Sequence, residues 1–330
     1  MKKVLIWCIL VVLPLAAITF YDEELSENFV NRWSFQELCD HHFDPRYVWP
    51  TPTQAGKPVS FSSQDVKPGD LIFVRDFEYY LEHKHHHINV PHFIMTHGEY
   101  LDSFKEEYLE LIDGKTLLAW FTVHPCSIEH ERVVPLPLGV VQYKEMYDEK
   151  KKTFKNFMRL RKRKKDKLLY KNFTEWRMPE RTRIRQLFEQ SSFCTKGEPC
   201  EFGRYISELA DHRFVLSPPG LGPDCYRVWE SLLVGTIPIV QHSYLDSLYE
   251  GLPILFIDSW EEVTQKFLEE QYEKITNQAY SQKKLFMNHW IDRIDEVRKK
   301  YWPQGAGVFI PIRDKKRPNC FRARSDGFSY

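Results

Sequence analysis

The stretch that decides the fold is residues 214–240, FVLSPPGLGPDCYRVWESLLVGTIPIV. An apolar run leads into the Pro/Gly-rich residues 217–223, and a helical pattern and a second apolar run follow. The prolines remove backbone donors from residues 217–223 and the glycines allow unusual dihedral angles, so this segment can be neither a helix nor a central strand. The pattern predicts strand, loop, helix, turn and strand. Such a loop at the carboxyl end of a parallel strand is where open α/β sheets bind ligands.

The helix inside this stretch has two recognisable ends. Asp224 is placed to be its N-cap, and Gly235 is placed to end it as the C′ residue. A helical wheel groups one set of side chains on a face that suits the core: Cys225, Trp229, Leu232 and Leu233. The opposite face carries Arg227, Glu230 and Ser231.

Arg227 and Glu230 are the first candidate binding residues. Arg227 lies in the first helical turn, where the helix macrodipole disfavours a cation. A diphosphate over that end would reverse the disadvantage, and it matches both the guanidinium fork and the free N–H groups. Glu230 could accept hydrogen bonds from the vicinal hydroxyls of a ribose. The alternative is that Arg227 pairs with Asp224 and Glu230 on a solvated face.

Further apolar runs extend on both sides of this stretch. They span 71–75, 92–96, 117–123 and 133–140 before it, and 167–173, 213–217, 236–241 and 252–258 in the second half. Continuous apolar runs indicate strands covered on both faces, as in parallel sheets, and helical patterns alternate with them. The charged residues 144–167 interrupt the pattern. We therefore expect two α/β domains with a cleft between them, at 21–150 and 151–330, after a hydrophobic segment at 1–20.

Two helical patterns close the chain, at residues 259–279 and 282–301. The second pattern places four apolar side chains on one face at three- and four-residue spacing: Phe286, Trp290, Ile294 and Val297.

The charges of the chain balance overall but not locally. Lys+Arg and Asp+Glu number 46 each among 330 residues, which argues against a nucleic-acid partner. The basic run at 159–167, RLRKRKKDK, is either a solvated linker or exposed helix, or an attractor of an anionic donor, acceptor or membrane surface.

The N-terminus predicts a location outside the cytoplasm. Lys2 and Lys3 precede an apolar run at 4–20, and Asp22, Glu23 and Glu24 follow it. This asymmetry favours a cytoplasmic N-terminus with the remainder translocated. The run is short for a membrane-spanning helix, so it is either a retained single-pass anchor or a signal peptide whose removal would leave a secreted protein.

Two clusters suggest other chemistry. Cys194 and Cys200 enclose a short turn and form the expected disulfide. Four histidines invite a metal interpretation: His83, His85, His86 and His87. No matching Cys or acid spacing accompanies them, so a solvated loop between Tyr80 and Pro91 is expected and no metal site is predicted.

The central stretch resembles the nucleotide-sugar-binding core of exostosin-type glycosyltransferases. In that family a strand ending in a Pro/Gly loop leads to an Arg- and Glu-bearing helix and then to G-x-[IV]-P-[IV]-[IV]; Arg227, Glu230, Gly235 and Pro238 match it here. The likeness covers residues 214–263 and is weaker over 68–140. It implies a GT-B fold of two Rossmann-like domains facing a cleft, with Glu on ribose and Arg near the phosphates. The implied nucleotide-sugar-binding residues are Ser217, Pro219, Gly220, Asp224, Arg227 and Glu230.

The same resemblance implies sugar transfer from a nucleoside diphosphate, with UDP preferred, to a glycan or other hydroxyl acceptor. The chain contains no Asp-x-Asp, which agrees with inverting, metal-independent transfer without a further cofactor. Arg227 would stabilise the leaving diphosphate. Glu99 is the first candidate for the base and His97 the second, followed by Asp102 and His124. The alternatives are a GT-B-derived binding protein without catalysis, or a hydrolase, for which no convincing carboxylate pair stands out.

Overall fold

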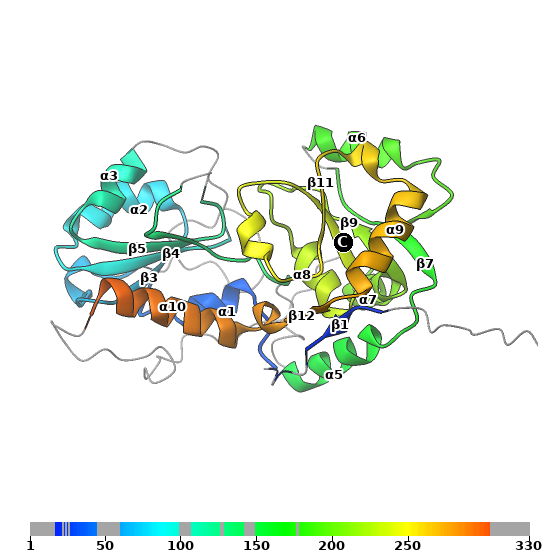
Figure 1. Cartoon of the computed structure of the whole chain (residues 1–330). Coiled ribbons are helices and arrows are strands. Elements are labelled where there is room, and N and C mark those ends of the chain that lie inside the picture. The colour runs from blue at the N-terminus through cyan, green and yellow to red at the C-terminus, as the bar shows by residue number, and fades with distance from the viewer. Residues whose placement is uncertain are drawn as a thin grey trace, which may run out of the picture.

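The computed structural model describes residues 17–21, 23, 25, 27–44, 60–98, 107–125, 129–141, 149–175 and 178–303. The chain forms two lobes, each built around a five-stranded parallel sheet (Figure 1). Within the described residues no helix is both long and apolar enough to cross a bilayer. The predicted anchor falls mainly on residues 1–16, outside the described residues.

The first lobe contains the sheet with strand order β2-β3-β4-β5-β6. Its strands are β2 (His41–Phe43), β3 (Leu71–Val74), β4 (His92–Thr96), β5 (Leu117–Thr122) and β6 (Val133–Pro135). Its helical segments are α1 (Arg32–Glu37), η1 (Ser63–Asp65), α2 (Phe77–His83), η2 (His85–His87) and α3 (Glu107–Asp113). Every neighbouring pair is parallel, as the continuous apolar runs predicted.

The second lobe contains the sheet with strand order β11-β10-β9-β7-β8, also parallel throughout. Its strands are β7 (Lys167–Lys171), β8 (Cys194–Lys196), β9 (His212–Leu216), β10 (Ile237–Gln241) and β11 (Leu255–Ile257). The helical segments are α5 (Lys150–Arg161), α6 (Pro179–Leu187), α7 (Phe202–Ala210), α8 (Tyr226–Leu233), η3 (Asp246–Tyr249), η4 (Trp260–Glu262), α9 (Gln265–Thr276) and η5 (Lys283–Leu285). A separate pair joins β1 (Thr19–Phe20) to β12 (Ala279–Tyr280).

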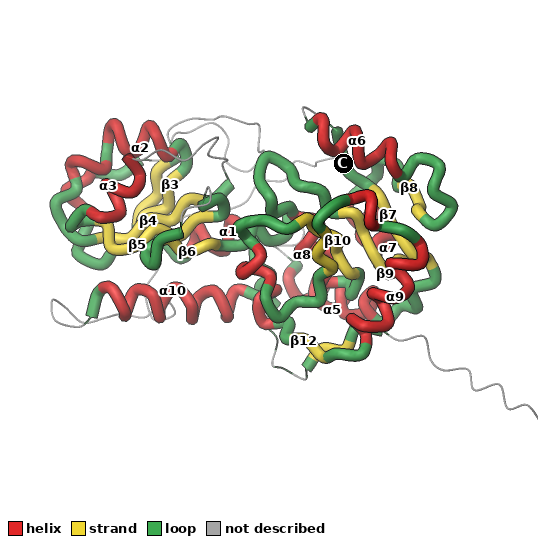
Figure 2. The backbone as a smooth tube through the Cα atoms, turned by 45° about the horizontal axis from the view of Figure 1, so that its top comes forward, coloured by secondary structure: helices red, strands yellow, loops and turns green. Residues whose placement is uncertain are grey.

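The last helix, α10 (Met287–Tyr301), leaves the second lobe and lies beneath the first sheet, where it contacts β5 (Figures 1 and 2). Its predicted apolar face is confirmed, because Phe286, Trp290, Ile294 and Val297 are all buried. These side chains join one hydrophobic cluster that also contains Phe121 of β5 and Val215 of β9. One core therefore runs through both lobes.

Successive side chains along each strand point to opposite faces of the sheet, so they belong to different hydrophobic clusters. In the first lobe, Ile72 and Ile94 face a cluster with α2 and α3, whereas Phe73 and Met95 face the shared core. In the second lobe, Leu169, Phe214 and Ile239 point to a third cluster, covered by α6 and α9. Both faces of each sheet are thus covered.

The predicted strands are found, with ends that differ by a few residues. The strands β2 and β8 were not predicted, because each has three residues of largely polar sequence, HHF and CTK. The segment between Tyr80 and Pro91 is not simply a loop, because it contains the end of α2 and the short helix η2.

The predicted Cys194–Cys200 disulfide is wrong, since both thiols are free. Cys194 lies on β8 and packs against the cluster under α6 and α9, whereas Cys200 packs against the core shared by the lobes. The two side chains are thus committed to different clusters, and the short spacing in sequence does not bring them together.

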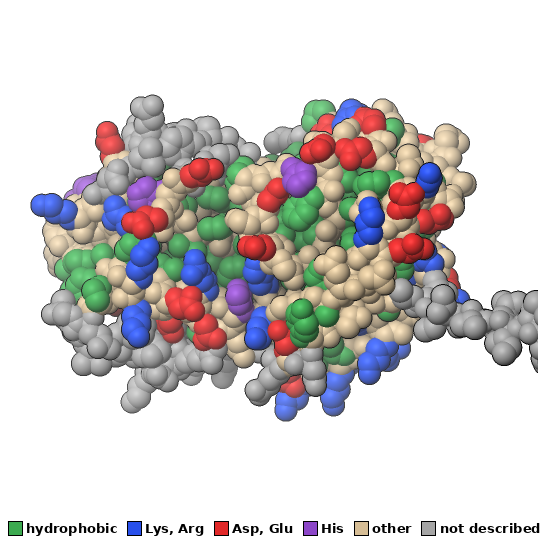
Figure 3. Space-filling model, viewed as in Figure 1, with side chains coloured by type: hydrophobic (Ala, Val, Ile, Leu, Met, Phe, Trp, Pro, Cys, Tyr) green, Lys and Arg blue, Asp and Glu red, His purple; other side chains and the backbone are tan. Residues whose placement is uncertain are grey.

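The basic run at 159–167 is not simply a solvated linker. Exposed Lys and Arg side chains do gather over α5 at the lower edge of the molecule in Figure 3. Arg161, however, donates to the carbonyls of Leu232 and Leu233 at 3.2 and 3.0 Å. Lys165, which is 5% exposed, donates to those of Ala210 and Val234 at 2.9 and 3.0 Å. These cations satisfy the carboxyl ends of α7 and α8.

Candidate functional site

The Pro/Gly loop follows β9, as predicted, and a few polar contacts fix it. The Ser217 N–H donates to the carbonyl of Ile239 at 3.0 Å, and the Gly220 N–H donates to that of Gly222 at 2.9 Å. Gly222 is required here, because a Cβ atom at this position would lie 2.1 Å from Cε1 of His124. The loop of the second lobe therefore packs directly on the end of β5 in the first lobe.

Asp224 is not the N-cap of α8; that position belongs to Cys225. The Asp224 carboxylate is buried instead, and it accepts hydrogen bonds from Trp229 Nε1 at 2.9 Å, Tyr249 OH at 2.8 Å and Leu138 N–H at 2.7 Å. Burial raises its pKa to about 6, against the lowering effect of these donors. Asp224 therefore joins the two lobes.

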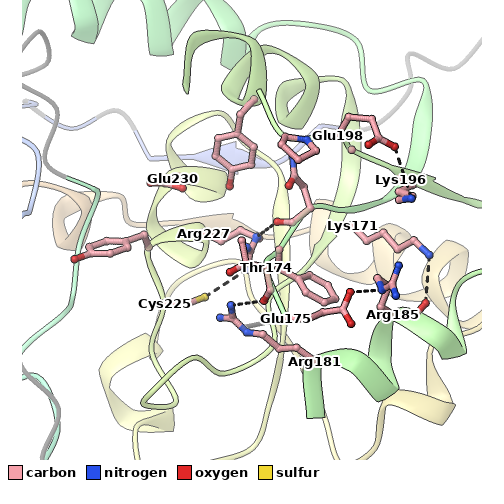
Figure 4. A pocket seen from close by; sticks show the side chains of 16 residues that line it. Lys171, Thr174, Glu175, Arg181, Arg185, Lys196, Glu198, Cys225, Arg227 and Glu230 are labelled. Atoms are coloured by element: carbon pink, nitrogen blue, oxygen red, sulfur yellow. Dashed lines mark hydrogen bonds and ion pairs between the residues drawn. The ribbon is translucent and has the colours of Figure 1, made fainter. Parts of the chain in front are cut away.

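A cavity of about 600 Å³ opens at the carboxyl ends of β7 and β8 and at the start of α8 (Figure 4). Its wall contains Lys171, Asn172, Phe173, Thr174, Glu175, Arg181, Arg185, Lys196, Gly197, Glu198, Pro199, Tyr205, Cys225, Tyr226, Arg227 and Glu230. The predicted residues Arg227 and Glu230 thus meet in one cavity. Ser217, Pro219, Gly220 and Asp224 are not part of this wall.

Arg227 is partly buried, and a main-chain contact fixes its guanidinium. Its Nε donates to the carbonyl of Asn172 at 3.0 Å, just beyond the end of β7. The ring of Phe173 lies 5.6 Å from the guanidinium carbon. A cation is therefore held in the first turn of α8, where the helix dipole alone would disfavour it.

Glu230 does not lie on a solvated face, which was the alternative to a role in ligand binding. It is 1% exposed, and its neighbour Ser231 is fully buried. The N–H of Val141 donates to Glu230 Oε1 at 3.4 Å. Tyr205 also forms a hydrogen bond with Glu230, and burial together with this carboxylate raises the pKa of the Tyr205 hydroxyl. The apolar side chains of α8 belong to the shared core, and Arg227 and Glu230 line the cavity.

The sequence did not single out four further cations in the cavity wall: Lys171, Arg181, Arg185 and Lys196. Three of them face carboxylates. Lys171 pairs with Glu189 at 3.1 Å, Lys196 with Glu198 at 3.7 Å, and Arg185 with Glu175. Arg181 instead donates from Nε to the carbonyl of Pro219 at 2.8 Å. No sequence signal separates Arg181 from Arg183 and Arg185, which lie on the same helix.

Of the candidate bases, Glu99 and Asp102 lie outside the described residues. His97 is fully buried after β4, and its Nε2 forms a 3.1 Å hydrogen bond with the carbonyl of Pro137. Burial, followed by the nearby charge of Arg32, lowers its pKa to about 3. His124 is 5% exposed, and burial lowers its pKa to about 4. Both imidazoles are therefore neutral at physiological pH.

The four histidines do not form one cluster. His83 stacks on Tyr79, His85 lies against Tyr80, and the rings of His86 and His87 lie 4.1 Å apart. Across the described residues, no group of three or more His, Cys, Asp or Glu side chains could hold a metal ion.

The chain is an α/β protein with two parallel sheets, and a cavity lined by several cations lies at the carboxyl ends of strands of one sheet. Open α/β sheets bind ligands at this position. Residues 140–302, which contain the whole cavity wall, match the family model of the RXYLT1 C-terminal domain. The matched model describes an exostosin-family glycosyltransferase domain. The resemblance seen in residues 214–263 is confirmed.

Comparison with solved structures finds a similar chain in the "Crystal structure of GtfA/B complex", with 11% identity and a TM-score of 0.35. The match covers 72% of the present chain and 59% of the other, so it spans about three fifths of that chain's length. A comparison with curated proteins finds no match.

Proposed function

We propose that this protein is a glycosyltransferase that transfers a sugar from a nucleoside-diphosphate sugar to a glycan or other hydroxyl acceptor. The donor is a UDP-sugar, and transfer inverts the anomeric centre without a metal ion. The family match supports glycosyl transfer. The observation that carries the donor assignment is the meeting of Arg227 and Glu230 in one cavity.

The chemistry of these two groups suits the two polar parts of a nucleoside diphosphate. A guanidinium binds phosphate oxygens through parallel charge-assisted hydrogen bonds. A carboxylate can accept hydrogen bonds from vicinal hydroxyls, and Glu230 enters the cavity one helical turn after Arg227. Arg227 binds the diphosphate in this proposal and Glu230 binds the ribose. As the bond to the sugar breaks, negative charge grows on the phosphate, and Arg227 stabilises it.

The base comes from the first lobe in this proposal. Glu99 remains the first candidate and His97 the second, both just after β4. His97 has the neutral state that a base needs, but full burial keeps its ring away from an acceptor, which favours Glu99. Loss of the base should lower kcat about 10²–10⁴-fold. Parent-level turnover in Glu99→Gln would remove Glu99 from the mechanism.

The two-lobed arrangement suits a GT-B enzyme, in which donor and acceptor meet between two α/β domains. We extend the proposal to the N-terminus: the apolar segment before β1 anchors the chain, and both lobes lie outside the cytoplasm. A C-terminal reporter that is active only in the cytoplasm would contradict this topology.

Calorimetric titration tests the donor assignment. The parent protein should bind UDP, and Glu230→Gln should weaken binding about 10–100-fold, as expected when a charged hydrogen-bond acceptor is lost. Glu198→Gln is the matched control, because Glu198 lies in the same wall but pairs with Lys196. A parent protein that binds no nucleotide would refute the proposal.

The rival is a protein that retains the fold and binds nucleotide sugars without catalysis. A hydrolysis assay with a panel of nucleotide sugars separates the two, because a transferase slowly releases nucleotide from its donor. Tight donor binding without any release or transfer would favour the binding protein.

A further inference from the structure

Two arginines from different helices lie against one aromatic ring in the cavity. Arg181 belongs to α6 and Arg227 to α8, and their guanidinium carbons lie 6.0 and 5.6 Å from the centre of the Phe173 ring. Figure 4 shows both side chains beside Cys225. Burial lowers the pKa of Arg181, and the charge of Arg227 lowers it further. The fold thus holds two like charges close together.

Arg181 differs from the other cations of the wall in its partners. Within the described residues, it donates only to main-chain carbonyls: Pro219 at 2.8 Å, Thr174 at 3.1 Å and Pro218 at 3.4 Å. A guanidinium has five N–H donors, so these three bonds leave others for a ligand. Lys171, Arg185 and Lys196 by contrast face carboxylates. A fold that partly buries Arg181 beside a second arginine, and gives Arg181 only main-chain carbonyls as partners among the described residues, favours an anion there.

We propose that Arg181 is a second phosphate-binding residue, and that with Arg227 it makes the site selective for a diphosphate over a monophosphate. This rests on the proposed donor site. The oxygens of two linked phosphoryl groups can accept hydrogen bonds from both guanidiniums at once. The oxygens of a single phosphoryl group lie closer together, so they reach both guanidiniums less well. A bound diphosphate also removes the mutual repulsion of the two arginines.

Arg181 has a structural role as well, because its bonds to Pro218 and Pro219 hold the Pro/Gly loop. The two roles have different signatures. Loss of a loop support should weaken all nucleotides alike. Loss of a phosphate-binding group should weaken a diphosphate more than a monophosphate, and should not affect a nucleoside.

The experiment measures binding of UDP, UMP, uridine and inorganic pyrophosphate to the full chain by calorimetry. In Arg181→Met, affinity for UDP and pyrophosphate should fall about 10–100-fold, the span for loss of a charged hydrogen-bond donor. Affinity for UMP should fall less than threefold. Arg183→Met is the control, because Arg183 lies on the same helix but is exposed and pairs with Glu180 and Glu261. Where Arg181→Met does not fold, Arg181→Lys, which keeps the charge but loses the fork, should lose part of the UDP preference.

Equal losses for UDP and UMP, or UDP binding unchanged by the Arg181 substitution, would overturn the proposal. A parent protein that binds pyrophosphate but not UDP would keep the diphosphate site and refute UDP as the nucleotide. A parent protein that binds neither would refute the donor site itself and this inference with it.

Discussion

The two ends of helix α8 use cations in opposite ways. At its carboxyl end, Arg161 donates to the carbonyls of Leu232 and Leu233, and Lys165 to that of Val234. These positive charges agree with the helix dipole and satisfy groups that the helix leaves without partners. At its amino end, Arg227 opposes the dipole and faces a cavity. A cation at the carboxyl end of a helix, where the dipole favours it, indicates a structural role. A cation at the amino end beside a cavity, where the dipole disfavours it, indicates a ligand-binding role.

The largest expected effect concerns the amino end. Arg227→Met should lower the turnover of the proposed reaction about 10²–10³-fold, the span for loss of one group that stabilises transition-state charge. Its free energy of unfolding should change by less than about 1 kcal/mol. Steady-state kinetics and urea unfolding of the same preparation give both quantities. An Arg227→Met protein with a much lower free energy of unfolding than the parent protein would contradict the proposed difference between the two ends of α8.

The next effect concerns the carboxyl end and has the opposite signature. Arg161→Met should lower the free energy of unfolding by about 2–3 kcal/mol, because charge-assisted hydrogen bonds to two buried carbonyls are lost. Nucleotide affinity of the folded fraction should stay at the parent level. Arg159→Met on the same helix is the control, since Arg159 is exposed and donates to Asn156. Equal unfolding of the two variants would show that Arg161 does not stabilise α8.

The smallest effect is a dependence on pH. Burial lowers the pKa of Lys165 to about 7, below its usual 10.5. Between these values the unfolded chain binds the proton and the folded chain releases it, so this group makes stability rise with pH above 7. From pH 7 to 8 the slope from one group is at most about 1.4 kcal/mol per pH unit. Urea unfolding of Lys165→Met should lack this rise relative to the parent protein; identical pH profiles would contradict it.

Much of the fold was predictable because it depends on local pattern. Continuous apolar runs located most strands of both sheets, and the spacing of Phe286, Trp290 and Ile294 identified the buried face of α10. The Pro/Gly loop after β9 was equally clear. The lobe that α10 covers could not be predicted, because an apolar helix face shows that the helix is buried but not which element it packs against.

The donor residues show the limit of the same reasoning. Arg227 and Glu230 were found because their helix and its motif are contiguous in sequence, but the burial of Glu230 was not predicted. Phe202–Ala210, the helix that carries Tyr205, was not predicted, and it helps to enclose Glu230. Asp224 was predicted as an N-cap because its residue type and position suit one. Its carboxylate instead accepts hydrogen bonds from Trp229, Tyr249 and Leu138, and so it joins the two lobes.

The sequence by itself determined the parallel α/β architecture, the loop and helix that carry Arg227 and Glu230, and the resemblance to exostosin-type glycosyltransferases. Only the tertiary structure decided which cations are structural and which face the cavity. The reason is physical: charge and periodicity are properties of a segment, but the partner of a charge is set by segments far away in the chain. Arg161 meets Leu232 and Arg181 meets Pro219 only after the sheet has brought them together.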